Sequence, residues 1–336
     1  MLVHPGILAL LCGALLTVVI LAAAALLGMG ILRRWDRNST TEVQLRLERR
    51  TYLISSLVSY AFTFEIASLL LFVYTADELH DLFAGAMCAT GVLNANPTGW
   101  WVLYLKIASF FLCGVWLMVN AYDQRSDELP LIRLKYGALL LLLPFFLLEA
   151  VLLVRYFTGL SPSIITSCCG ALFSSSKTTM AGSLSGLPMV PAMTVFYGMA
   201  LAYVIALLFC LRGGAAGSCV AAGAVAVLFF LVALAAVISF ISVYIYEMPT
   251  HHCPFDILQA EYGYVGYPLY ASLFGSVLCG IMAAVAALLA RKTSLARVVA
   301  GESKVWSRRA LLLLAIFLAV ASWPLVSGSF SMRSYL

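Results

Sequence analysis

Long apolar runs alternate with short polar segments along this chain, and the polar segments are rich in Gly, Pro and charged residues. Each apolar run is roughly 20 residues or longer, which is the length an α-helix needs to cross about 30 Å of hydrocarbon. The pattern predicts an all-α, polytopic transmembrane helix bundle with about eight spans, forming a single integral membrane domain over residues 1–336. The predicted spans are 6–32, 52–76, 101–121, 136–158, 190–211, 219–246, 265–290 and 310–328.

Composition supports the membrane interpretation and excludes a soluble domain. Of the 336 residues, 63% are hydrophobic and only 10% are charged, which is more apolar surface than one soluble core could cover. Lys and Arg exceed Asp and Glu by 20 to 15, but membrane proteins gather basic residues at one interface for topological reasons. We therefore expect the lipid bilayer as partner and no nucleic acid.

Basic residues separate to one side of the predicted bundle when the N-terminus is placed outside. Sixteen of the twenty Lys and Arg residues then fall in cytoplasmic segments, as the positive-inside rule requires, and both termini are extracytoplasmic. The cytoplasmic segments are 33–51, 122–135, 212–218 and 291–309. The glycosylation sequon at Asn38 lies on the cytoplasmic side and should be silent. Together with the compact spans, this favours a bacterial inner membrane.

Cysteines and histidines gather in the three predicted extracytoplasmic loops, which run over residues 77–100, 159–189 and 247–264. Four of the nine cysteines lie there, at least one in each loop, and two histidines precede the last of them. These residues are Cys88, Cys168, Cys169, His251, His252 and Cys253. The other cysteines are expected to be small apolar packing residues, and they are Cys12, Cys113, Cys210, Cys219 and Cys279.

Three interpretations of the loop cluster are open. Cys88, Cys168, Cys169 and Cys253, with His251 and His252, form the ligand set of a soft or borderline metal such as copper or zinc. The same four cysteines could instead carry out catalytic thiol–disulfide exchange, or form two structural disulfides in an oxidising compartment.

One short motif bears on the exchange interpretation. Cys253-Pro254 resembles the Cys-Pro opening of thioredoxin-type sites, but Asp256 stands where the second Cys of such a motif would be. The chain contains no Cys-x-x-Cys, so that chemistry is not carried over from the resemblance.

Three charged residues fall inside predicted spans. They are Glu65, Lys106 and Glu149, all in the half of the bundle beneath the cysteine-bearing loops. A charge at membrane depth costs about 2.5–3.5 kcal/mol on insertion scales, so these side chains should face the bundle interior with partners. They form either a structural Glu–Lys pair that locks adjacent helices or a proton or ion relay, and Lys106 could alternatively extend to the interface.

These observations give three hypotheses of function. The first is a membrane thiol–disulfide oxidoreductase or soft-metal handling protein, with the loop cysteines as the site and a metal ion or a quinone as cofactor. The second is a small-solute transporter with structural disulfides and with Glu65, Lys106 and Glu149 in the pathway. The third is a noncatalytic subunit that anchors extracytoplasmic redox or metal-carrier proteins.

Overall fold

The computed structural model describes residues 2–35, 41–126, 129–161, 163–166, 188–213 and 215–328. The described chain is helical and contains no strand, which confirms the all-α prediction for these residues. Eight of its helices are long and apolar enough to cross a membrane. The chain divides into two compact units, one of residues 1–84 and 91–166 and the other of residues 85–90 and 167–336.

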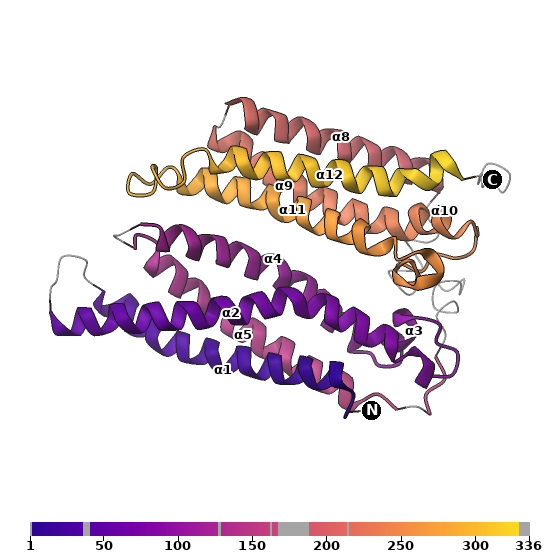
Figure 1. The fold of residues 1–336 in the computed structure, drawn as a ribbon, viewed down its shortest axis with the longest axis horizontal. Helices are drawn as coiled ribbons and strands as arrows, with labels where there is room; N and C mark the ends of the chain where they lie inside the picture. Colours follow the sequence, from indigo (N-terminus) through magenta and orange to yellow (C-terminus); the bar gives the residue numbers. More distant parts are fainter. Residues whose placement is uncertain are drawn as a thin grey trace. The chain divides into compact units, whose positions relative to one another are not determined.

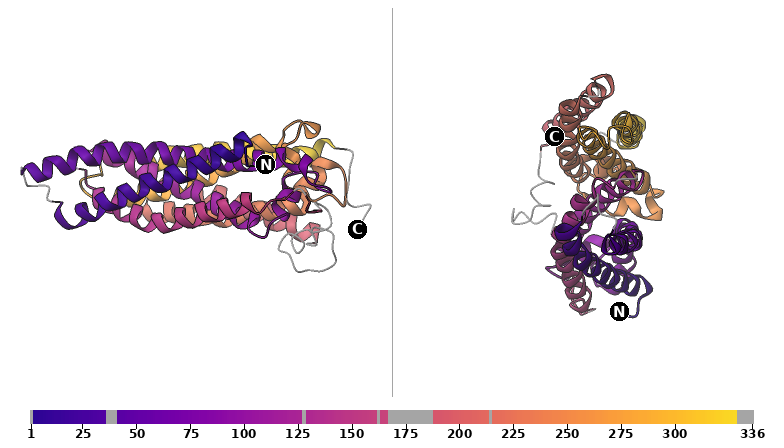
Figure 2. Two further views of the ribbon diagram at one scale, coloured as in Figure 1. Left: turned by 90° about the horizontal axis from the view of Figure 1, so that it is seen from below. Right: turned by 90° about the vertical axis from the view of Figure 1, so that its left-hand side faces the viewer.

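Unit 1 is a four-helix bundle (Figure 1). Its long helices are α1 (Pro5–Arg34), α2 (Glu42–Glu78), α4 (Gly99–Gln124) and α5 (Ile132–Thr158), with short helices η1 (His80–Leu82) and α3 (Ala89–Asn94) between α2 and α4. Each long helix packs against the one before and the one after it, and α5 closes the ring against α1. The four helices run lengthwise beside one another (Figure 2).

Unit 2 repeats this cyclic order with a second set of four helices. It contains α8 (Met189–Gly213), α9 (Ala216–Ala236), which continues through the π-helical turn η2 (Val237–Ile241) into α10 (Ser242–Tyr246), then α11 (Gly266–Leu289) and α12 (Glu302–Ser327). The pairs α8–α9, α9–α11, α11–α12 and α12–α8 are in contact. The short 3-10 helices η3 (Asp256–Leu258) and η4 (Ala260–Tyr262) precede α11.

Burial is inverted relative to a soluble bundle, because charged side chains lie inside and leucines lie outside. Lys106 is 0% exposed, whereas Leu141 on the neighbouring α5 is 77% exposed. Water would favour the opposite arrangement, so the inversion is compatible with a multi-pass protein whose outer surface faces lipid.

Helix α2 is longer than the span predicted for it. It begins at Glu42 rather than at residue 52 and contains 37 residues, about 55 Å at 1.5 Å per residue, which exceeds the hydrocarbon thickness. Its first turns are held by a Glu42–Arg46 ion pair at 2.5 Å and a hydrogen bond from Gln44 to Glu48 at 3.0 Å. Such i,i+4 pairs stabilise a helix in water, so apolarity alone underestimates its length.

The expectation that Cys210 and Cys219 are packing residues is wrong, because these two cysteines form a disulfide. Cys210 lies near the end of α8 and Cys219 in the first turn of α9. The tight connection between the two helices brings the cysteines opposite each other, with 4.7 Å between their Cα atoms.

Small residues let α9 and α11 approach closely. A Cβ added at Gly280 of α11 would lie 2.9 Å from the Ala226 Cβ and would also meet the hydroxyl of Tyr203, which donates a hydrogen bond to the Ser276 carbonyl at 2.9 Å. A Cβ at Gly223 of α9 would lie 2.7 Å from the Ala284 Cβ. Such small-residue contacts commonly hold helices together in membranes.

Gly280→Ala should therefore destabilise the protein, whereas Gly198→Ala should not. The added methyl at residue 280 has no room, and overpacking costs about 1–3 kcal/mol. The same change at Gly198 of α8 meets nothing within 4 Å, and the helix propensity of Ala should add about 0.5–1 kcal/mol. Unfolding in detergent micelles measures both, and equal effects of the two variants would contradict the close packing of α9 and α11.

Candidate functional site

The candidate site is built around Cys253, on the loop that follows α10. Helix α10 ends where Glu247 adopts a left-handed conformation with φ of 55°, which turns the chain away from the helix axis. Two tyrosine hydroxyls then fix the loop backbone: Tyr246 donates to the Cys253 carbonyl and Tyr270 donates to the Pro254 carbonyl, each at 2.6 Å. Cys253 is thus held on a rigid support and is 2% exposed.

Cys88 supplies the second sulfur from a segment far away in the sequence. Residues 85–90 follow α2 along the chain but belong to unit 2, where Gln259 Nε2 donates to the Met87 carbonyl at 3.2 Å. The side chain of Cys88 is fully buried, and its Sγ lies 3.2 Å from Cys253 Sγ. The hydroxyl of Thr90 lies 3.4 Å from the same Cys253 sulfur.

Asp256 connects this sulfur pair to a histidine. Cys253 Sγ donates to Asp256 Oδ1 at 3.1 Å, and His251 Nε2 donates to Asp256 Oδ2 at 2.6 Å. Burial opposes the ionised carboxyl, but the hydrogen bonds from His251, Cys88 and Cys253 outweigh burial and hold the pKa of Asp256 below its ordinary value. Asp256 is therefore a carboxylate at neutral pH, with Oδ1 toward Cys253 and Oδ2 toward His251.

The two neighbouring histidines have different surroundings. The side chain of His251 is 16% exposed, so it links the buried carboxylate to the surface. His252 Nδ1 instead donates at 2.9 Å to the Ile238 carbonyl, in the π-helical turn η2. Burial lowers the pKa of His252, which favours a neutral ring. A π-helical turn shifts the carbonyls out of the normal hydrogen-bond ladder, and His252 satisfies one of them.

The structure brings together some of the predicted site residues and separates others. Cys88, Cys253 and His251 share one cluster, whereas His252 faces η2. Cys168 and Cys169 lie outside the described residues. Glu65, Lys106 and Glu149 meet in unit 1, where Lys106 is fully buried rather than extended to an interface.

Two charged residues of unit 1 were assigned to a cytoplasmic segment on sequence grounds but are buried. Asp123, in the last turn of α4, and Lys135, in the first turn of α5, form an ion pair at 2.8 Å and are 0% and 1% exposed. Asp256 was likewise noted only as the residue that replaces a second cysteine. Its spacing of three residues from Cys253 is the signal that could have identified it as a hydrogen-bond acceptor for that thiol.

The two sulfurs lie closer together than two thiolates bound to one zinc ion would. The Sγ–Sγ distance of 3.2 Å is longer than a disulfide bond of about 2.05 Å, so Cys88 and Cys253 are two thiols in contact rather than a disulfide. Two thiolates on a tetrahedral zinc, each at about 2.3 Å, would stand about 3.8 Å apart. Comparison with protein-family models, with curated proteins and with solved structures gives no match, so the site is interpreted on its chemistry alone.

Replacing Asp256 with Asn should lower the free energy of unfolding at neutral pH by about 1–3 kcal/mol, because charge-assisted hydrogen bonds are lost. The folded-state pKa of Asp256 is depressed, so its contribution is fully present above the unfolded pKa of about 3.9 and is lost as the pH falls through the folded value.

Unfolding of both proteins across pH 3–8 measures this difference. The stability gap between wild type and D256N should be constant above about pH 5 and should close in acid. A gap that does not depend on pH would mean that the carboxylate charge contributes nothing. Glu42→Gln, at an exposed ion pair on α2, is the control.

Proposed function

We propose that this chain is an integral multi-pass membrane protein that carries out thiol–disulfide exchange at Cys88 and Cys253. The observation that carries the proposal is the contact of the two sulfurs at 3.2 Å, with the Asp256 carboxylate accepting a hydrogen bond from Cys253. A purely structural disulfide needs no carboxylate and imidazole beside it, whereas an exchanging thiol needs a group that takes its proton.

The exchange balances with a disulfide-bearing protein as co-reactant. Cys253 releases its proton outward along the hydrogen bonds of Asp256 and His251, and the resulting thiolate attacks one sulfur of the external disulfide while the other sulfur leaves and is protonated. The Cys88 thiolate then attacks Cys253 Sγ, forms the internal disulfide and releases the second sulfur as a thiol. The co-reactant gains two electrons and two protons, which Cys88 and Cys253 lose.

The distribution of basic residues indicates on which side of the membrane each loop lies. We infer that both termini and the Cys88–Cys253 site are extracytoplasmic and that the membrane is a bacterial inner membrane, because the loops on the opposite side carry most of the Lys and Arg. The co-reactant is then an extracytoplasmic redox protein. A part for Cys168 and Cys169 in the exchange stays a prediction from the sequence.

A soft metal ion is the second candidate ligand. Cys88, Cys253 and Asp256 each offer one ligand atom, and these atoms all lie within 4.8 Å of one another. Binding zinc would require the sulfurs to separate by about 0.6 Å relative to their present distance. A copper or zinc ion that protects both thiols from alkylation would favour this candidate.

Redox titration of the reconstituted protein tests the exchange. In defined glutathione or dithiothreitol buffers, Cys88 and Cys253 should interconvert between dithiol and disulfide as one two-electron couple. Alkylation of the remaining thiols, with mass-spectrometric assignment of the alkylated residues, measures the fraction that is reduced at each buffer potential. C88S should trap a mixed disulfide at Cys253, and C113S, at a buried cysteine in unit 1, is the control. If the pair does not titrate, or reacts only after a chelator is added, the exchange proposal fails.

Labelling from one side of the membrane tests the topology separately. Glu261→Cys, at an exposed residue near Cys253, should react with a membrane-impermeant maleimide in intact spheroplasts. Ser294→Cys, exposed in the segment between α11 and α12, should react only after permeabilisation. The reverse result would invert the topology and place Cys88 and Cys253 in the cytoplasm.

A further inference from the structure

Lys106 is the centre of a fully buried polar cluster in unit 1, which is independent of the proposed thiol site. Its ammonium lies 2.9 Å from Glu65 Oε2, 2.7 Å from Glu149 Oε1 and 2.7 Å from Ser68 Oγ. A lysine ammonium has three donors, and all three are used here. Since a neutral amine would have only two, this geometry describes a charged lysine.

The charges around Lys106 do not balance. Glu65, Lys106 and Glu149 are 1%, 0% and 2% exposed, and two carboxylates with one ammonium leave one net negative charge. An uncompensated charge is strongly disfavoured in a low-dielectric interior, where a group is neutralised instead. A single bound proton would balance the charge of the cluster.

Hydrogen bonds indicate which carboxylate holds that proton. Glu65 Oε2 is contacted by both Lys106 and Ser68, at 2.9 and 3.0 Å. Glu149 has its Lys106 contact at Oε1 only, and its Oε2 is buried without a hydrogen-bond partner in the described structure. The Ser109 hydroxyl lies beside Glu149 and also donates to the Lys106 carbonyl, at 2.9 Å. Glu149 Oε2 is the position open to a proton.

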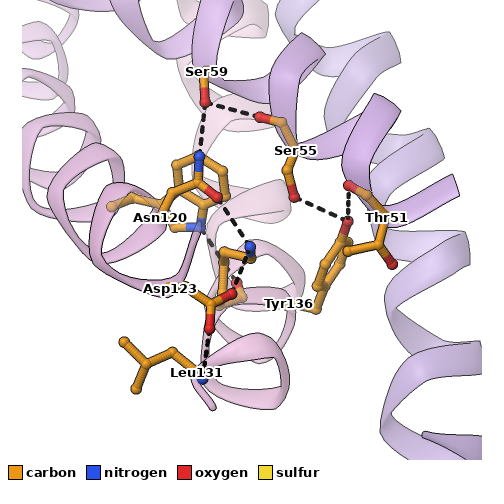
Figure 3. A network of polar contacts seen from close by, with 9 residues as sticks. Thr51, Ser55, Ser59, Asn120, Asp123, Leu131 and Tyr136 are labelled. Atoms are coloured by element: carbon orange, nitrogen blue, oxygen red, sulfur yellow. Dashed lines mark hydrogen bonds and ion pairs between the residues drawn. The ribbon is translucent and has the colours of Figure 1, made fainter. Parts of the chain in front are cut away.

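A second ion pair in the same unit shows what a balanced cluster looks like (Figure 3). Lys135 Nζ contacts Asp123 Oδ2 at 2.8 Å and Asn120 Oδ1 at 2.9 Å, while Asp123 Oδ1 accepts the Leu131 backbone N–H at 2.7 Å. One carboxylate meets one ammonium, so this pair needs no proton. The Asp123–Lys135 pair is therefore a structural clamp between α4 and α5, whereas the Lys106 cluster has one negative charge without a partner.

Aromatic layers enclose the Lys106 cluster on both sides along the bundle. Phe62 lies one turn before Glu65 on α2 and packs against Trp116 and Phe146, with ring centroids 5.1 and 5.4 Å apart. Phe72 lies two turns after Glu65 and packs against Tyr156 and Phe157, at 5.7 and 6.2 Å. A proton held between these layers is occluded from both ends of the unit.

We propose that Glu65, Lys106 and Glu149 form a proton-binding site in unit 1, with one exchangeable proton carried on Glu149. Among the residues that the structure describes, Cys113 of α4 is a further titratable group beside it, and it is buried. Helix α1, which packs against α2 and α5, carries no ionisable side chain between the exposed Cys12 and Arg33. The charge of the cluster is therefore set by its own three members.

Infrared spectroscopy of the reconstituted protein tests this site. At neutral pH the wild type should show the carbonyl band of one buried protonated carboxylic acid, which shifts in D2O and disappears at alkaline pH. The band should be absent in E149Q. It should also be absent in E65Q, because Glu149 would then be the sole carboxylate of Lys106 and would ionise. Persistence of the band in both variants would overturn the assignment.

Thermal unfolding of the variants tests the proton on Glu149 independently of the infrared band. Because glutamine mimics a protonated glutamate, E149Q should keep the melting midpoint of the wild type at neutral pH. D123N should lower it clearly, because it leaves Lys135 as an unpaired buried charge. If E149Q is destabilised as much as D123N and the wild type shows no carbonyl band, both glutamates are ionised and the cluster is a clamp only. Failure of thiol exchange at Cys88 and Cys253 would leave this outcome unchanged.

Discussion

A buried charge in an apolar helix bundle must be matched inside the bundle, and this constraint organises unit 1. Hydrocarbon offers no hydrogen bonds, so each buried donor or acceptor has to find its partner on a neighbouring helix. Lys106 of α4 meets this requirement only when Glu65 of α2 and Glu149 of α5 converge on it. One lysine therefore fixes the rotation and axial position of three helices, while the exposed leucines on their outer faces leave these unspecified.

The same constraint explains why the buried charged residues described in unit 1 fall into two clusters. The network of Asn120, Asp123 and Lys135 lies where α4 ends and α5 begins (Figure 3). The Lys106 cluster lies further along the same two helices. Phe62 and Trp116 pack in the layer between them. The low dielectric of that layer strengthens each ion pair and raises the free-energy cost of a charge without a partner. The one carboxylate in excess at Lys106 therefore favours the binding of a proton.

The helices could be predicted from the sequence because apolar runs of sufficient length leave few alternatives, but the contacts between loops could not. Cys88 and Cys253 are separated by 165 residues, and no local pattern indicates that their sulfurs meet. Asp123 and Lys135 resemble ordinary loop charges until the ends of α4 and α5 are seen to enclose them. The hydrogen bond from His252 to the Ile238 carbonyl in the π-helical turn η2 is likewise a tertiary contact that no local pattern indicates.

The arrangement of Asp256 supports the proposal that its site moves protons as well as exchanging disulfides. A carboxylate that coordinated a metal through Oδ1 would give up the hydrogen bond from Cys253, and its other oxygen would still hold His251 at 2.6 Å. In the dithiol state both oxygens are used, one by the thiol and one by the imidazole. His251 reaches the surface while Cys253 does not. A proton that leaves Cys253 thus has a continuous route outward through Asp256 and His251, which a structural disulfide would not require.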